Sequence, residues 1–181
     1  MNIKPVALAI VSVSHETDVE LEILDCILPY DLDSRVVKTG IPGVIIIESR
    51  LDGRYIIDIL KKCFISKARR IMPIDKIVKT DINEIVDNVI SLSNIIADPC
   101  KNFRVDLKNY GKKKINKDKY IVDKIARRLK EEKGWIINLK NPEIIVFVCI
   151  LNEITLLSLL KRNDIWNVKN YINSLSVTTL L

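Results

Sequence analysis

The sequence predicts an α+β fold of two consecutive units, a β-α-β-β-α-β unit over residues 1–75 and an α/β domain over residues 76–165, followed by a C-terminal tail over residues 166–181. Two observations predict it. Short runs of β-branched and aliphatic residues alternate with stretches of helical apolar spacing, and turn and capping residues separate them. Positive charge is also concentrated in the second unit. Aromatic residues make up only 6% of the chain, so we expect cores of Ile, Leu and Val.

In the first unit we expect strands over residues 6–13, 34–38, 44–48 and 69–74. A helix is predicted over residues 17–28, with Ser14 or Thr17 near its cap, although residues 19–23 also alternate as a strand does. Asp52 is expected to cap a second helix, because the apolar residues after it share one helical face. This order is that of the ferredoxin-like arrangement, in which two helices cover one face of an antiparallel sheet.

In the second unit we expect strands over residues 103–108, 143–150 and 154–160. Asp81 is predicted to cap one helix, and Asn116 to cap another that runs to about Lys133 and stops at Gly134. The apolar run 144–151 is far shorter than the roughly 20 residues that span a bilayer, so it indicates a buried strand. A short helix is expected in the tail, around residues 166–172.

Positive charge gathers in residues 101–140, which hold 14 Lys and Arg against 5 Asp and Glu. The rest of the chain holds 15 basic and 18 acidic residues. A local basic surface of this kind suits a polyanionic partner. On the helix from Asn116, Lys119, Arg127 and Lys130 fall opposite the apolar stripe, and this cationic face is either a solvated helix surface or a surface that follows phosphates.

Two motifs of the second unit resemble those of the THUMP domain, a tRNA-binding module. The first is Phe103-Arg104-Val105-Asp106-Leu107-Lys108-Asn109-Tyr110-Gly111-Lys112-Lys113-Lys114, and the second is Leu139-Lys140-Asn141-Pro142-Glu143-Ile144-Ile145-Val146. The stretches 39–44 and 70–75 also look like the N-terminal part of archaeal THUMP adaptor proteins, in which a small ferredoxin-like domain precedes the THUMP domain. The resemblance departs at Asn109-Tyr110-Gly111, where arginine-rich residues are common, and at Cys149, where an acidic residue often stands.

The resemblance implies that the second unit holds the acceptor stem and 3′ end of tRNA by shape and by phosphate contacts. The RNA-binding residues that it implies, together with the cationic helix face, are Arg104, Lys108, Lys112, Lys113, Lys114, Lys119, Arg127, Lys140 and Asn141. Tyr110 is the candidate for stacking on a base. Arg69 and Arg70, with Lys67, either extend this surface or are inert surface charges.

No catalytic, cofactor or metal motif is recognisable in the sequence. The single histidine, His15, has no evident nucleophile partner, and a capping or surface role is expected for it. The four cysteines, Cys26, Cys63, Cys100 and Cys149, form no C-x-x-C pair, so we expect reduced, mostly buried thiols, with a disulfide as the alternative.

The sequence therefore predicts a non-catalytic, cytoplasmic tRNA-binding protein without a cofactor of its own, and no signal peptide or membrane span is expected. No room is expected for an enzymatic domain after the THUMP-like strands. The resemblance to stand-alone archaeal adaptors implies a separate acetyltransferase that forms N4-acetylcytidine in tRNA and uses acetyl-CoA and ATP. The alternatives are an adaptor for methylation or thiolation of tRNA, or an interaction module for an acidic protein.

Overall fold

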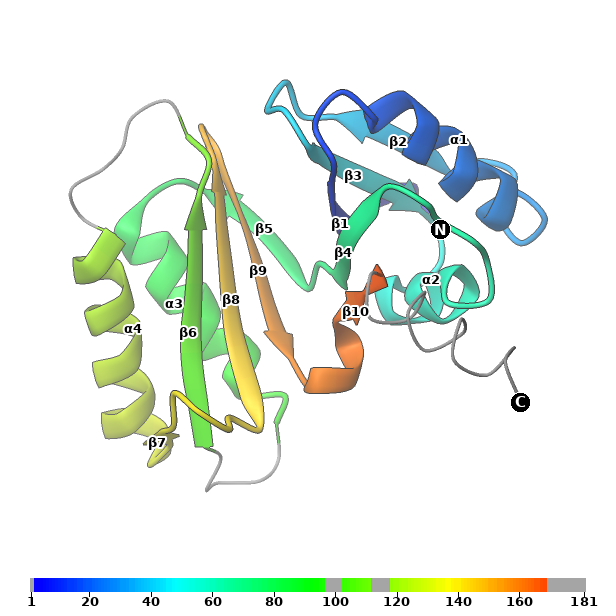
Figure 1. Ribbon diagram of the computed structural model, residues 1–181. Coiled ribbons are helices and arrows are strands. Elements are labelled where there is room, and N and C mark those ends of the chain that lie inside the picture. The colour runs from blue at the N-terminus through cyan, green and yellow to red at the C-terminus, as the bar shows by residue number, and fades with distance from the viewer. Residues whose placement is uncertain (1, 97–101, 112–117, 169–181) are drawn as a thin grey trace. The chain divides into compact units, whose positions relative to one another are not determined.

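The computed structural model describes residues 2–96, 102–111 and 118–168. The described chain divides into two compact units (Figure 1), one made of residues 2–73 together with 164–168 and one made of residues 74–163. The division lies two residues before each boundary expected from the sequence. The second unit is thus inserted into the first along the chain, because residues 164–168 belong to the first unit again.

The first unit contains the expected β-α-β-β-α-β order. Its elements are β1 (Lys4–Val11), α1 (Glu16–Ile27), β2 (Arg35–Lys38), β3 (Val44–Ser49), α2 (Gly53–Leu60) and β4 (Ala68–Pro73). The strands form an antiparallel sheet in the order β4-β1-β3-β2. This is the split β-α-β pairing of the ferredoxin-like fold, so the fold class predicted from the sequence is confirmed.

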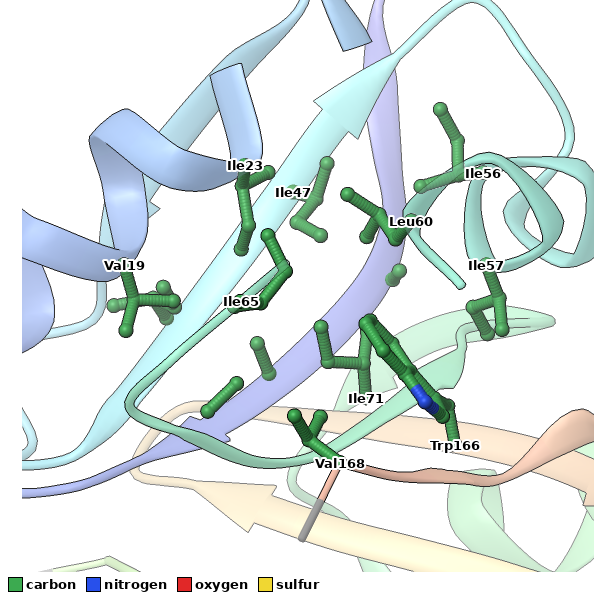
Figure 2. Packing of buried hydrophobic residues seen from close by; sticks show 14 of the residues in the cluster. Val19, Ile23, Ile47, Ile56, Ile57, Leu60, Ile65, Ile71, Trp166 and Val168 are labelled. Carbon is green, nitrogen blue, oxygen red and sulfur yellow. The ribbon is translucent and has the colours of Figure 1, made fainter. Parts of the chain in front are cut away.

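The core of the first unit lies between the sheet and its two helices. Figure 2 shows α1 side chains (Val19 and Ile23) and α2 side chains (Ile56, Ile57 and Leu60) pointing toward Ile47 and Ile71 of the sheet. All are at most 1% exposed. Burying one such aliphatic side chain stabilises the fold by about 1.5–3 kcal/mol. The apolar residues at helical spacing in the sequence are therefore the ones that bind both helices to the sheet.

Local signals set the ends of these elements. Asp52 caps α2 as predicted, since its carboxylate accepts hydrogen bonds from the backbone N–H groups of Arg54 and Tyr55. The residue at the N-cap of α1 is His15, which directly follows Ser14, and no side-chain hydrogen bond caps that helix. In the turn between β2 and β3, Gly40 and Gly43 have positive φ angles of 76° and 74°.

The tail contributes a fifth strand to the first sheet. β10 (Trp166–Asn167) pairs antiparallel with β4, and Trp166 lies opposite Ile71. The indole packs in the first core at 4% exposure (Figure 2). The short helix expected around residues 166–172 is therefore wrong at its first two residues, because pairing with the open edge of β4 overrides the helical spacing.

The second unit is a sheet with helices on one face (Figure 1). Its elements are β5 (Lys76–Lys79), α3 (Ile82–Ser93), β6 (Asn102–Asn109), α4 (Asp118–Lys133), β7 (Ile136–Ile137), β8 (Ile144–Leu151), β9 (Ile154–Leu160) and the 3₁₀ turn η1 (Arg162–Asp164). The strand order is β5-β9-β8-β6-β7. The expected strands and helices are present, whereas β5 and β7 were not predicted because they are only four and two residues long.

The two sheets differ in one pairing that matters for the site. β6 runs parallel to β8, with Phe103 opposite Ile144 and Asn109 opposite Ile150, and α4 lies on the crossover between them. β8 is buried along its whole length, as expected for an uninterrupted apolar run. The core beneath α3 and α4 includes Phe103 and Trp135, whose ring centroids lie 5.8 Å apart.

The cysteines depart from the sequence prediction. Cys26 of α1 and Cys63, just after α2, form a disulfide across 37 residues of chain, so reduced thiols were the wrong prediction for this pair. Cys149 is a free, buried thiol, and burial raises its pKa to about 12. Cys100 lies outside the described residues.

Candidate nucleic-acid interface

The cations of β6 lie on one face of the strand. Arg104, Asp106 and Lys108 alternate with apolar residues that belong to the core side, Phe103, Val105 and Leu107. Asp106 lies between the two cations, 3.9 Å from the Arg104 guanidinium and 3.6 Å from the Lys108 ammonium. The Asp106 carboxylate offsets part of the positive charge that the sequence motif alone suggests.

The corner between β6 and α4 is held together by Asn109. Its side-chain oxygen accepts a hydrogen bond from the Gly111 N–H at 3.0 Å, and its amide nitrogen donates to Asp118 at 3.0 Å. A Cβ on Gly111 would lie 3.2 Å from the Asn109 side-chain oxygen, so a side chain at this position would crowd the hydrogen bond that closes the corner. Tyr110 is half-buried, and its N–H donates to the Ile150 carbonyl.

The residues Lys112, Lys113 and Lys114, which the family resemblance assigns to RNA, lie outside the described residues. Their flanks are described, however. Asn109 at the end of β6 donates a hydrogen bond to Asp118 at the start of α4.

Three of the basic residues of α4 bind side chains of α3 or of the residue after it. Lys124 donates to Asn83 at 2.7 Å, Arg128 binds Asp87, and Lys133 binds Asn94. Arg128 also donates to Glu132 at 2.5 Å. Hydrogen bonds to these two carboxylates, that to Glu132 first, raise the pKa of the Arg128 guanidinium above its usual value. We call this row of contacts the α3–α4 seam.

The remaining cations of α4 are those on its outer face. Lys119, Arg127 and Lys130 are exposed. None of them makes a hydrogen bond or ion pair to any residue that the structure describes. Lys119 and Arg127 were both predicted to bind RNA, and they are free to meet phosphates in a way that the seam residues Lys124 and Arg128 are not.

The turn before β8 is organised by Asn138, which sequence reasoning missed. Its side-chain oxygen accepts from the N–H groups of Lys140 (3.2 Å) and Asn141 (3.0 Å), and its amide donates to the Asn141 carbonyl. The predicted RNA contact Asn141 accepts a hydrogen bond from Arg162 at 2.6 Å. Lys140 is exposed and Pro142 is buried, so the proline shapes this turn from within.

The predicted residues of the second unit fall at two ends of the sheet. Because β6 and β8 are parallel (Figure 1), the Lys140–Asn141 turn lies at the start of β6, whereas Lys108 and Tyr110 lie at its end. Lys119 lies at this end too, since the preceding residue, Asp118, is bonded to Asn109. At a rise of about 3.3 Å per residue, the strand separates these ends by about 20 Å. A surface that uses both ends therefore fits an elongated polyanion better than a small anion.

The basic residues predicted in the first unit have separate surroundings. Arg70 of β4 donates through Nε to the side-chain oxygen of Asn167 at 3.1 Å. Arg69 is exposed. These two arginines lie on the strand that pairs with β10, so at least Arg70 has a structural partner.

No helix in the described part of the chain combines the length and the apolar composition that crossing a membrane requires.

The family comparison assigns the second unit. Residues 79–160 match the model of the THUMP domain, and this range contains both motifs on which the resemblance rested. A comparison with curated proteins gave no match.

Solved structures share the fold of the chain. PH1313 from Pyrococcus horikoshii Ot3 has a TM-score of 0.67 at 14% identity over 87% of this chain and 55% of that one. TrmN from Thermus thermophilus has a TM-score of 0.59 at 16% identity, over 85% and 45%. A 4-thiouridine synthetase in complex with RNA and ATP has a TM-score of 0.58 at 15% identity, over 87% and 41%. The chain thus spans about half the length of these structures, and the likeness concerns the fold.

Proposed function

We propose that this chain, whose residues 79–160 form a THUMP domain, is a tRNA-binding adaptor. It holds the acceptor stem and 3′ end of tRNA and presents the tRNA to a separate modification enzyme, the acetyltransferase that forms N4-acetylcytidine. The adaptor itself is non-catalytic. The THUMP match carries the proposal, because the THUMP domain is an RNA-binding module.

The geometry supports the binding step. Exposed cations on α4 and beside the β6–α4 corner give sequence-independent contacts with phosphates. Cations at both ends of a strand about 20 Å long can contact several phosphates of a stem, whereas one small ligand would not reach both ends.

A second candidate is an adaptor for thiolation or methylation. One of the structures with this fold is named a 4-thiouridine synthetase and is bound to RNA. The two candidates share the binding step and differ in the enzyme that acts on the tRNA.

The binding step is tested with the purified full chain and total tRNA over a salt series, with the 3′ terminal nucleotides present or removed. We expect a salt-steep affinity that falls when the 3′ end is trimmed. Equal affinity for intact and trimmed tRNA would reject acceptor-end recognition, and no binding at moderate salt would reject the proposed function.

The enzymatic step is tested by adding the chain to a tRNA acetyltransferase with acetyl-CoA, ATP and tRNA. We expect it to raise the yield of N4-acetylcytidine, measured by mass spectrometry of the digested tRNA. A chain that binds tRNA but has no effect in this assay, and instead raises thiouridine or methylated nucleosides with the corresponding enzyme, would favour the second candidate.

A further inference from the structure

A pocket opens between the first turns of α3 and α4, on the helical side of the THUMP domain. Its volume is about 580 Å³, and it is lined by Asp81, Ile82, Asn83, Tyr120 and Lys124. Apart from the capping role of Asp81, none of these residues was predicted to have a function. The pocket is large enough for a nucleotide and combines an aromatic ring, an apolar floor and polar groups, which is the usual composition of a small-ligand site.

Tyr120 gives the pocket a flat, accessible wall. The side chain stands on the first turn of α4 and is 55% exposed. Ile82, at the start of α3, is only partly buried against the second core. An exposed aromatic ring beside an aliphatic side chain suits a planar heterocycle, since stacking of bases on aromatic residues is common in single-strand recognition.

Asp81 gives the pocket a hydrogen-bond acceptor. Its Oδ1 accepts from the N–H groups of Asn83 (2.8 Å) and Glu84 (3.0 Å). Both of these bonds end on Oδ1, which leaves Oδ2 as the oxygen that can accept from a ligand. Backbone hydrogen bonds, that from Glu84 first, lower the pKa of this carboxyl group, so it is ionised at neutral pH and can only accept. Lys124, bonded to Asn83, adds a cation at the same pocket.

We propose that this pocket takes one unpaired nucleobase of the bound RNA, stacked on Tyr120, and that Asp81 selects a base with an exocyclic amino group. The inference rests on the proposed function, because it needs RNA on this domain. Cytosine and uracil have the same shape but differ at one position, where cytosine carries an amino donor and uracil a carbonyl acceptor. A carboxylate oxygen accepts from the first and repels the second.

The stacking role is tested with one RNA hairpin, either blunt or extended by a 3′ tail of four cytidines or four uridines, and with fluorescence anisotropy on the full chain. We expect Tyr120→Ala to weaken binding of the cytidine-tailed RNA by roughly tenfold and to leave the blunt hairpin unchanged. Tyr120→Phe should retain the tail affinity. Tyr55→Ala is the matched control, since Tyr55 stands on a helix of the first unit at 50% exposure.

The selective role is tested by Asp81→Asn, because asparagine also caps helices well and keeps α3 in place. We expect the wild type to favour the cytidine tail over the uridine tail, and Asp81→Asn to lose or invert this preference, because its amide can donate to the uracil carbonyl. Asp52→Asn is the matched control, since Asp52 caps α2 with the same pair of backbone contacts.

The outcomes separate the two proposals. A wild type that binds neither tailed nor blunt RNA would reject the proposed function and the pocket together. A wild type that binds RNA while Tyr120→Ala binds every tail equally well would overturn the pocket alone. Equal affinity of the wild type for cytidine and uridine tails would overturn the selection by Asp81.

Discussion

Asp31 shows how one buried acid can organise a loop. It follows α1 and is 8% exposed. Its Oδ2 accepts from the Ser49 hydroxyl at 2.5 Å, the Arg50 N–H at 2.8 Å and the Ser34 hydroxyl at 3.1 Å. These bonds, that from Ser49 first, lower the pKa of Asp31 to about 2. The carboxylate therefore joins the end of α1 to the end of β3.

We expect Asp31→Ala to lower the free energy of unfolding by about 2–4 kcal/mol, because it leaves buried hydroxyl and N–H donors without an acceptor. Urea unfolding at neutral pH measures the loss. Asp33→Ala is the control, since Asp33 is half-exposed and pairs with Arg50 on the surface; its effect should be small. Equal losses in the two variants would contradict this role of Asp31.

The same residue predicts a pH dependence. A carboxyl group whose pKa is lower in the folded state stabilises the protein above its unfolded pKa of about 4 and loses that contribution as the pH falls through about 2. The difference in unfolding midpoint between wild type and Asp31→Ala should therefore be constant above pH 5 and shrink between pH 4 and pH 2. A difference that persists unchanged at pH 2 would argue that packing, not charge, explains the loss.

At the scale of elements, the α3–α4 seam separates the α4 cations that have partners within the protein from those that face solvent. The sequence places Arg127 and Arg128 side by side on a basic helix. In the structure Arg127 is exposed, whereas Arg128 binds Asp87 and Glu132. A guanidinium already paired with two carboxylates would neutralise few RNA phosphates, so its contribution to counterion release from the RNA would be small.

We expect Arg127→Ala to weaken tRNA binding several-fold and to lower the slope of log affinity against log salt by about 1. Arg128→Ala, the adjacent and chemically identical change, should leave that slope nearly unchanged and affect the stability of the helix pair. Equal slopes for the two variants would show that α4 does not contact phosphates through its outer face. Filter binding over a salt series checks both.

At the scale of the whole molecule, the chain leaves the first unit at residue 73 and returns to it at residue 164. The two tryptophans are divided by this topology. Trp166 completes the first core and Trp135 belongs to the second, at 4% and 1% exposure. Both are packing residues. Stability of the first unit thus depends on a strand that lies 93 residues after β4 in the sequence.

We expect Trp166→Ala to cost about 3–5 kcal/mol of stability in the first unit, as for other large aromatic truncations in a core. Hydrogen exchange followed by mass spectrometry should show faster exchange in β1 and β4 and little change in β8 and β9. Trp135→Ala is the reciprocal control and should show the opposite pattern. Faster exchange of β8 in Trp166→Ala would mean that the tryptophan stabilises more than its own unit.

Much of the fold was predictable because its signals are local. Asp52 and Asp81 lie before helical apolar stripes and cap those helices, and β9 spans the residues expected for it. β5 and β7 were missed because such short strands carry no periodicity of their own. Of the candidate site, the cations of β6 and α4 were predictable by residue type, but their partners were not. Asp87 and Arg162 partner these residues from other elements, and the pocket around Tyr120 is formed by two helices. No local sequence pattern indicates such contacts.

The sequence by itself determined most of the helices and strands and which segment is basic, and it predicted the likeness of the second unit to the THUMP domain, because spacing, caps and motifs act over a few residues. Only the tertiary structure decided that β6 and β8 run parallel, and so that Lys108 and Lys140 lie at opposite ends of the sheet. It likewise decided that Trp166 packs in the first core and that Arg128 forms an ion pair with Asp87 of α3. Strand pairing and side-chain contacts join residues that are distant in the chain. The free energy of each contact depends on which partner the fold brings to it, and a short stretch of sequence does not contain that information.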